Sequence, residues 1–379
     1  MLKGRAKFLE KSWVIGLARF FSTAIYCIGF VSVIIGLASA THTDGNKGWA
    51  FFVFIPVFVL AAVAIHESGH FVAARRLGML VSQGRILFFE LLARQHHWKM
   101  RMCRPQVRTR ASGYVVAIPN FSRSVRRQFV FFALGGPAAN ITATVVFSVL
   151  GAWALSSDIS AILFAFAMLN FCYALANLIP NARIGSDGYI VIKNLFGEID
   201  EASLTISKLL WLSYEGTTAE RLPISDLKRL DEQPEPMPLL RRWFSMKAAQ
   251  NESRWADAVS EADASEENFS KLDASLRQPG VLLMADFFRI ERAFSQAMFS
   301  ENPVDLPESA FESTAWSSPH LKPRCQALNY ALSGDISKCE ELLVSSQTHA
   351  NESLDRALHE SEATIRNSIR AKCKHAACT

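Results

Sequence analysis

The stretch Ala64-Ile65-His66-Glu67-Ser68-Gly69-His70 decides how the rest of the chain is understood. On a helix, His66 and His70 are four residues apart, so both rings project from one face and can bind a single Zn²⁺. Glu67 lies beside them, which completes an H-E-x-x-H motif. The stretch therefore predicts a hydrolytic zinc site.

The same motif also arises by chance on solvated helices, where other polar residues surround it. Here the preceding run from Trp49 to Ile65 (WAFFVFIPVFVLAAVAI) contains no charged residue. Desolvating a carboxylate and two imidazoles without a compensating interaction is costly. The sequence therefore favours a functional site inside a membrane-spanning helix.

Charge is distributed unevenly along the 379 residues, although the net charge is only +5. Residues 1–196 contain 20 Lys and Arg against 6 Asp and Glu, whereas residues 197–379 contain 20 against 29. A basic half that is rich in apolar spans favours a lipid bilayer with anionic headgroups as its partner, and not nucleic acid.

Seven cysteines are scattered along the chain, which does not describe a secreted disulfide framework. The tail from Cys373 to Cys378 could in principle bind a metal. Three ligands on a segment expected to be frayed are weak evidence, so we expect no metal site there.

Four apolar runs are long enough to cross a membrane. They are Phe20–Ala40, Trp49–Arg75, Phe129–Leu155 and Ile159–Ile179. The basic residues before the first run and the small residues at its end also resemble a signal peptide. We expect a retained first helix, with cleavage as the alternative, and a short external turn at His42–Asn46.

The segment between Arg75 and Arg127 contains twelve Lys and Arg residues, Arg75 and Arg127 included, and one acidic residue, Glu90. By the positive-inside rule this loop is cytoplasmic. We therefore expect a multi-pass protein of a bacterial inner membrane with both termini in the cytosol. A nucleic-acid-binding patch is the alternative explanation of the arginines, but topology explains them more simply.

Short apolar runs within this loop, Arg85–Leu92 and Gly113–Pro119, are typical of strands at the membrane surface. At about 1.5 Å per residue, His66 lies roughly 25 Å from the outer end of its span. The predicted metal site is therefore near the cytosolic side, on the same side as the strands.

Three elements far apart in the chain together resemble the site-2 protease family of intramembrane zinc metalloproteases. They are His66-Glu67-x-x-His70, Gly136-Pro137-x-x-Asn140, and Asn177-x-x-Pro180 followed by Ser186-Asp187-Gly188. The resemblance covers roughly residues 49–195. Taken in this order and within apolar spans, the set is more specific than any one of its motifs.

The resemblance implies a role for each matching position. His66, His70 and Asp187 match the three zinc ligands, and Glu67 matches the general base. Asn140 matches a polar residue that steadies the substrate or the developing oxyanion. Two departures are Ser186, where many members have Leu, and a longer spacing between Pro180 and Asp187.

We expect a mainly α fold, in which a polytopic helical membrane part with a short β segment is followed by an α-helical soluble part. Apolar positions recur at helical spacing beyond Leu239, and short turns such as Ser333-Gly334-Asp335 favour paired helices of tetratricopeptide-like type. The Pro-rich run Asp231–Pro238 is typical of a stiff linker. The expected domains are a first segment at 1–48, a metalloprotease core at 49–196, a linker at 197–238 and a cytosolic helical domain at 239–379.

These features predict a zinc-dependent intramembrane endopeptidase that cleaves membrane-anchored proteins near the cytosolic face, with a helical domain that binds a protein partner. One alternative is a non-proteolytic scaffold or sensor in which the helical domain is the working surface. A metal transporter is less favoured because the spans offer few other polar residues. We expect His96, His97 and His320 to be surface residues, because nothing pairs with them at ligand spacing.

Overall fold

The computed structural model describes residues 9–41, 49–103, 113–197, 200–277 and 279–376, and the expected external turn at His42–Asn46 lies outside them. The described chain is mainly helical, as predicted, and contains one small sheet. It divides into two compact units. The first comprises Met1–Leu92 and Trp98–Ile199, and the second comprises Ala93–His97 and Asp200–Thr379.

Four helices of the first unit are long and apolar enough to cross a membrane, which fits a multi-pass membrane protein. They are α2 (Ser12–Thr41), α3 (Trp49–Leu77), α4 (Val125–Trp153) and α5 (Ser157–Leu178). All four predicted spans are present. The first helix begins at Ser12 instead of Phe20, because the residues before the apolar run continue the same helical hydrogen bonding.

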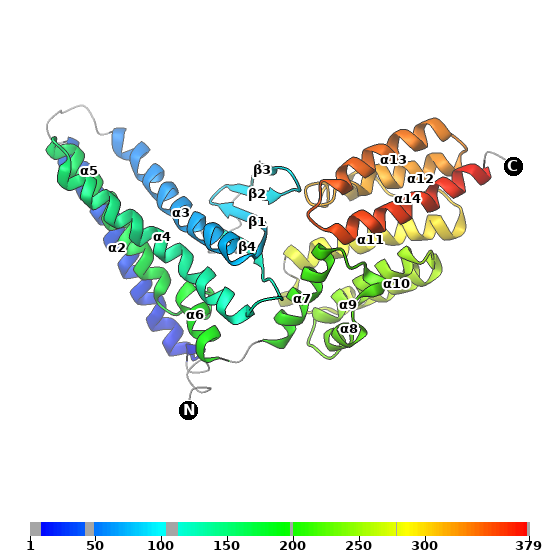
Figure 1. The fold of residues 1–379 in the computed structure, drawn as a ribbon, viewed down its shortest axis with the longest axis horizontal. Coiled ribbons are helices and arrows are strands. Elements are labelled where there is room, and N and C mark those ends of the chain that lie inside the picture. Colours follow the sequence, from blue (N-terminus) through cyan, green and yellow to red (C-terminus); the bar gives the residue numbers. More distant parts are fainter. Residues whose placement is uncertain (1–8, 42–48, 104–112, 198–199, 278, 377–379) are drawn as a thin grey trace. The chain divides into compact units, whose positions relative to one another are not determined.

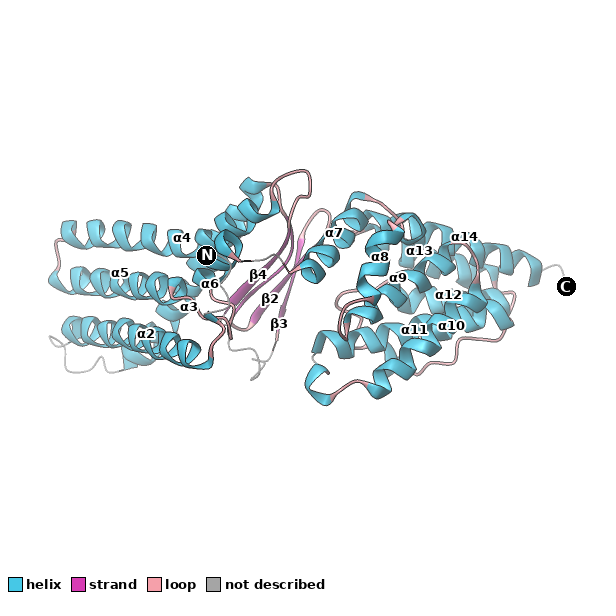
Figure 2. Ribbon diagram, turned by 90° about the horizontal axis from the view of Figure 1, so that it is seen from below, coloured by secondary structure: helices cyan, strands magenta, loops and turns pink. Residues whose placement is uncertain are grey.

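Close backbone contact determines how these helices pack. Helix α5 packs on α2 and α4, and α3 packs on α4 (Figures 1 and 2). A Cβ added to Gly69 would lie 2.2 Å from the carbonyl oxygen of Gly135, and a Cβ on Gly135 would lie 2.6 Å from that of Gly69. Small residues at a membrane helix crossing allow such contact. The two glycines therefore bring the H-E-x-x-H turn of α3 directly against α4.

A four-stranded sheet with the order β3-β2-β1-β4 follows α3. The strands are β1 (Leu80–Ile86), β2 (Phe89–Ala93), β3 (Trp98–Met102) and β4 (Gly113–Ile118), and β1 pairs antiparallel with both β2 and β4. The prediction of one strand over Arg85–Leu92 was wrong, because the chain reverses there at Leu87, whose φ is 49°. The apolar run covers the ends of two paired strands, and composition alone does not reveal the turn between them.

The second unit is made of helices that pack on their neighbours. They are α7 (Glu201–Glu215), α8 (Ile224–Asp231), α9 (Met237–Asn251), α10 (Trp255–Lys271), α11 (Pro279–Ser300), α12 (Leu321–Leu332), α13 (Ile336–Asn351) and α14 (Arg356–Ala376). Short 3₁₀ turns lie at Ala219–Arg221, Ala274–Leu276 and Glu308–Phe311. The tetratricopeptide-like character of this unit stays a prediction.

The segment expected to be a linker, 197–238, includes the helices α7 and α8. Leu209, Leu222 and Leu230 are buried and form one cluster with residues of α9, so α7 and α8 belong to the helical unit. Helix α14 also belongs to this unit, since Ile365, Ile369 and Cys373 lie in its main core.

A buried charged cluster lies inside this helical unit. Arg324 is fully buried and donates hydrogen bonds of 2.6 Å to Glu291 and to Glu362. His320 is also buried, 3.7 Å from Glu362, so its prediction as a surface residue was wrong. The residues next to His320 in the sequence did not indicate that the start of α12 lies inside the helical unit. His96, by contrast, is exposed, as is His97.

Candidate metal centre

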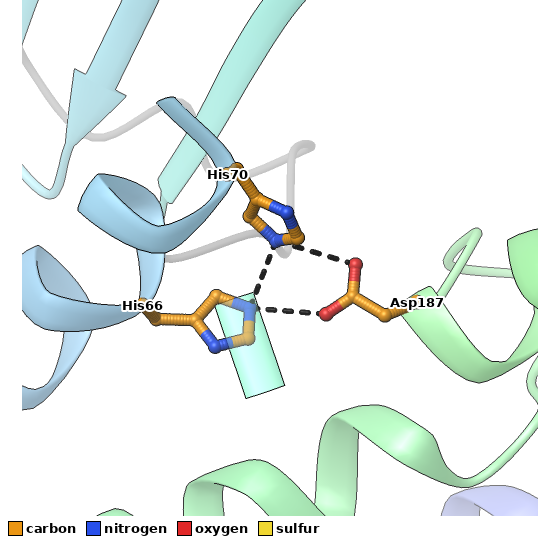
Figure 3. Close-up of side chains that lie close together, drawn as sticks. All are labelled: His66, His70 and Asp187. Carbon is orange, nitrogen blue, oxygen red and sulfur yellow. Dashed lines mark hydrogen bonds and ion pairs between the residues drawn. The ribbon is translucent and has the colours of Figure 1, made fainter. Parts of the chain in front are cut away.

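Helix α3 and helix α6 (Asp187–Phe196) bring three potential metal ligands together (Figure 3). The Nε2 atoms of His66 and His70 are 3.2 Å apart. The Asp187 carboxylate lies opposite, with Oδ2 at 3.1 Å from Nε2 of His66 and Oδ1 at 3.3 Å from Nε2 of His70. All three residues are buried.

Hydrogen bonds on the far side of each imidazole fix its tautomer. Nδ1 of His70 lies 2.8 Å from the carbonyl oxygen of Phe132, which can only accept a hydrogen bond. Nδ1 of His70 therefore carries the proton, and Nε2 keeps its lone pair.

The second imidazole is fixed in the same way by Asn140. Nδ1 of His66 lies 2.7 Å from Oδ1 of Asn140. The amide nitrogen of Asn140 donates to the Ala62 carbonyl at 3.2 Å and to Oδ1 of Asn170 at 2.8 Å, so its oxygen is left as the acceptor for His66. Nε2 of His66 thus also presents a lone pair.

The residues present fit a bound cation. Two nitrogen lone pairs and a carboxylate converge within 4.8 Å of one another in a buried site, an arrangement that is repulsive unless a positive charge lies between them. Two imidazoles and one carboxylate form a usual donor set for catalytic zinc, and the hydrogen bonds to Asn140 and Phe132 are of the kind that orient metal-binding histidines.

Asp187 is held in place by the turn that precedes it. Ser186 is the N-cap of α6: its hydroxyl accepts from the backbone N–H groups of Asn181 and Tyr189 and donates to the Ile179 carbonyl at 2.7 Å. Ser186 thus holds the turn that presents Asp187, the third potential ligand.

Gly136 leaves the space in which a metal could bind. A Cβ at this position would lie 2.5 Å from Nε2 of His70 and 2.7 Å from Nε2 of His66. No side chain larger than hydrogen fits there without displacing the imidazoles.

Glu67 faces a large cavity of about 1330 Å³ that also contains the three potential ligands. Its Oε2 is buried and has no hydrogen-bond partner among the described residues. Strand β4 passes so close that a Cβ on Gly113 would lie 2.5 Å from Oε1 of Glu67. Helices α2 and α5 complete the walls of the cavity, which has room for a peptide segment.

The structure places Asn140 behind His66, where it is fully buried and its polar atoms bond to protein groups. This position orients the imidazole, and the predicted contact of Asn140 with substrate stays a prediction. Sequence reasoning missed Asn170, the Phe132 carbonyl and the close approach of Gly113 to Glu67. Asn170 could have been found, because an Asn within an apolar span indicates a buried hydrogen-bond partner. The carbonyl of Phe132 could not, because every residue has a backbone carbonyl.

Comparison with known families supports the assignment of these residues to a protease site. Residues 54–156 match Peptidase family M50. The match bears out the resemblance to the site-2 protease family, and it includes His66, Glu67, His70 and Asn140. A match to this family supports a membrane protease. The matched segment ends before Asp187, so the match does not include that residue. No curated protein and no solved structure matches the chain.

Proposed function

We propose that the protein is a zinc-dependent intramembrane endopeptidase that hydrolyses membrane-anchored proteins near the cytosolic face. One observation carries the proposal: the lone pairs of His66 and His70 converge on the Asp187 carboxylate in the same buried cavity as an unpartnered oxygen of Glu67. The M50 match supports the protease class.

Zinc bound by these three residues would polarise a peptide carbonyl and lower the pKa of a coordinated water to about 7. Glu67 accepts the proton of the attacking water, which its unpartnered Oε2 is free to do. Glu67 then returns a proton to the leaving amine. Asn140 and the Phe132 carbonyl act as positioning groups, because they hold the two imidazoles in one tautomer and orientation.

Strand β4 provides a way to present an unwound substrate. The sheet order leaves one edge of β4 without a strand partner in the part of the chain that the structure describes. A substrate helix hides its carbonyls in its own hydrogen bonds, so it must unwind before cleavage. An extended segment that pairs along β4 passes Gly113 and therefore Glu67.

The orientation in the membrane rests on charge. The arginines that follow α3 favour the cytosolic side for the sheet and for the end of α3 that contains the site. We propose a bacterial inner membrane location with both termini in the cytosol, and a protein partner for the helical unit.

The test is the substitution Glu67→Gln, which keeps the size of the side chain and removes the base. Membrane fractions of cells that produce this variant should accumulate intact single-span proteins that the wild type cleaves, as measured by comparative proteomics. Glu215→Gln, at an exposed position of α7, is the matched control. If the Glu67→Gln variant fully complements a deletion strain, the alternative of a non-proteolytic scaffold or sensor replaces the proposal.

A further inference from the structure

A second cavity of about 280 Å³ lies next to the proposed catalytic base. Glu67, Tyr114 and Val115 line both this cavity and the larger one. Both cavities therefore border Glu67, the proposed general base.

The walls of the small cavity come from α3 and from one face of the sheet. Register places Gly84 of β1 opposite both Val115 of β4 and Leu91 of β2. Residues opposite one another in a sheet project from the same face, so this row points with Gly113 toward α3. On the other face, the side-chain amide of Gln83 donates hydrogen bonds to Glu90 and to the hydroxyl of Tyr114. The side chains of Val115 and Leu91, which face α3, are apolar.

Two aromatic side chains also line the cavity. Phe71 and Trp98 contact one another edge to face, with ring centroids 5.9 Å apart. An apolar cavity of about 150 Å³ is large enough to hold benzene. The cavity thus has room for one large apolar side chain, such as that of Phe, Leu or Met.

The cavity is open because residue 84 is glycine. A Cβ on Gly84 would meet only the carbonyl oxygen of Tyr114 within 4 Å, at 3.8 Å, so the space above this residue is empty. A Cβ at this position therefore fits without a backbone clash, and a larger side chain would extend into the cavity that Gly84 lines.

We propose that this cavity is a specificity pocket for a large apolar residue next to the scissile bond, and that Gly84 determines the size of the residue it accepts. This inference rests on the proposed function. Alternate residues of a segment paired along β4 would project from the same face of the sheet as Val115, which lines the pocket, so a long side chain beside the cleaved bond would lie next to the pocket.

The probe is a panel of single-span reporter proteins in membrane vesicles with the full-length enzyme. Positions in the cytosolic half of the reporter span are changed one at a time to Ala, Val, Leu or Phe, and mass spectrometry locates the cut. With the wild type, one position flanking the cut should favour Leu or Phe over Ala by about tenfold or more in kcat/KM.

Substitution at position 84 should reduce this preference in order of side-chain size. The ratio of kcat/KM for the Leu reporter to that for the Ala reporter should fall about tenfold for Gly84→Val and less for Gly84→Ala. Leu91→Ala enlarges the pocket and should shift the preference toward Phe. Gly16→Val, in α2 at a position with nothing within 4 Å, is the matched control and should leave the ratio as in the wild type.

The outcomes separate the pocket from the proposed function. Cleavage with unchanged side-chain ratios in both Gly84 variants and in Leu91→Ala overturns the pocket and leaves the protease standing. If the wild type cleaves no reporter, or Glu67→Gln cleaves as well as the wild type, the proposed function fails and the pocket with it. A lipid acyl chain in the pocket, found by native mass spectrometry in the presence of a cleavable reporter, also overturns the proposal.

Discussion

Oδ1 of Asn140 lies 2.7 Å from Nδ1 of His66 and joins α4 to α3 across 74 positions of sequence. The amide nitrogen of Asn140 is itself held by Ala62 and Asn170, so three helices contribute to the orientation of one imidazole. The geometry of the proposed metal site is therefore determined by the packing of the helices.

Loss of this hydrogen bond should weaken metal binding. In the variant Asn140→Leu, His66 loses the acceptor that fixes its tautomer, and we expect zinc affinity to fall about 10–100-fold. Competition with a chromogenic chelator in detergent solution measures the affinity. Asn194→Leu is the control, because the side chain of Asn194 bonds only to a carbonyl of its own helix among the described contacts. Equal affinities in the two variants would contradict the assignment.

Gly136→Ala should abolish metal binding while leaving the protein folded. The added methyl group would lie 2.5 Å from Nε2 of His70, inside the space that the metal needs. Zinc content by mass spectrometry and the size-exclusion profile of the purified variant test the two parts of this prediction. Gly16→Ala adds a methyl group where nothing lies within 4 Å and should retain its zinc.

Ser186→Ala should loosen the turn that presents Asp187. The hydroxyl of Ser186 caps α6 and binds the Ile179 carbonyl, and loss of such a cap costs about 1 kcal/mol. We expect faster exchange of zinc in a ⁶⁷Zn or radioactive zinc release assay. Ser186→Thr keeps the hydroxyl and should release zinc as slowly as the wild type. If the Thr variant releases zinc as fast as the Ala variant, the hydroxyl cap does not hold Asp187.

Arg324→Met should destabilise the helical unit strongly, because it leaves Glu291 and Glu362 as unpaired buried carboxylates. Removal of one partner from a buried ion pair costs about 3–5 kcal/mol. The loss is measured as a shift of the urea unfolding midpoint. Unfolding is monitored at a fixed pH by pulse labelling of the thiol of Cys325, which is buried in the folded unit. Arg289→Met removes an exposed pair with Asp286 and should cost about 0–1 kcal/mol. Similar losses in the two variants would show that the cluster is no more important than a surface pair.

The helical unit should also lose stability in mild acid. Burial lowers the pKa of His320 from 6.5 to about 4. The unfolded chain therefore binds a proton that the folded chain excludes, so the contribution is present above pH 6.5 and is lost as the pH falls toward 4. A difference of this size corresponds to about 3 kcal/mol.

The same labelling assay, with the unfolding step run between pH 7 and pH 4, tests this acid sensitivity. His320→Gln should flatten the pH dependence over this range, because it removes the titrating imidazole. Burial alone would raise the pKa of Glu291, but Arg324 and Lys247 hold it below its ordinary value, so that residue adds acid sensitivity only at lower pH. An unchanged slope in His320→Gln would contradict the role of the imidazole.

Local backbone geometry made part of this structure predictable. The four spans follow from unbroken apolar runs, because a chain in lipid must satisfy its own hydrogen bonds within a helix. The proximity of His66 and His70 follows from 3.6 residues per turn. Asp187 was predicted only from the resemblance to a known family, because no spacing rule predicts that it lies close to His66 and His70.

Other features were decided by tertiary structure, because they depend on contacts between segments far apart in sequence. Three such features depend on how α3, α4 and the sheet pack against one another. They are the hydrogen bond between Asn140 and His66, the approach of Gly113 to Glu67, and the pocket beside Gly84. Burial of His320 and Arg324 depends likewise on helices that reach them from other parts of the chain. The sequence by itself determined which segments are helices and which side chains share a helical face, since those are short-range properties of the backbone. Only packing decided what each side chain meets, because its partners come from distant segments.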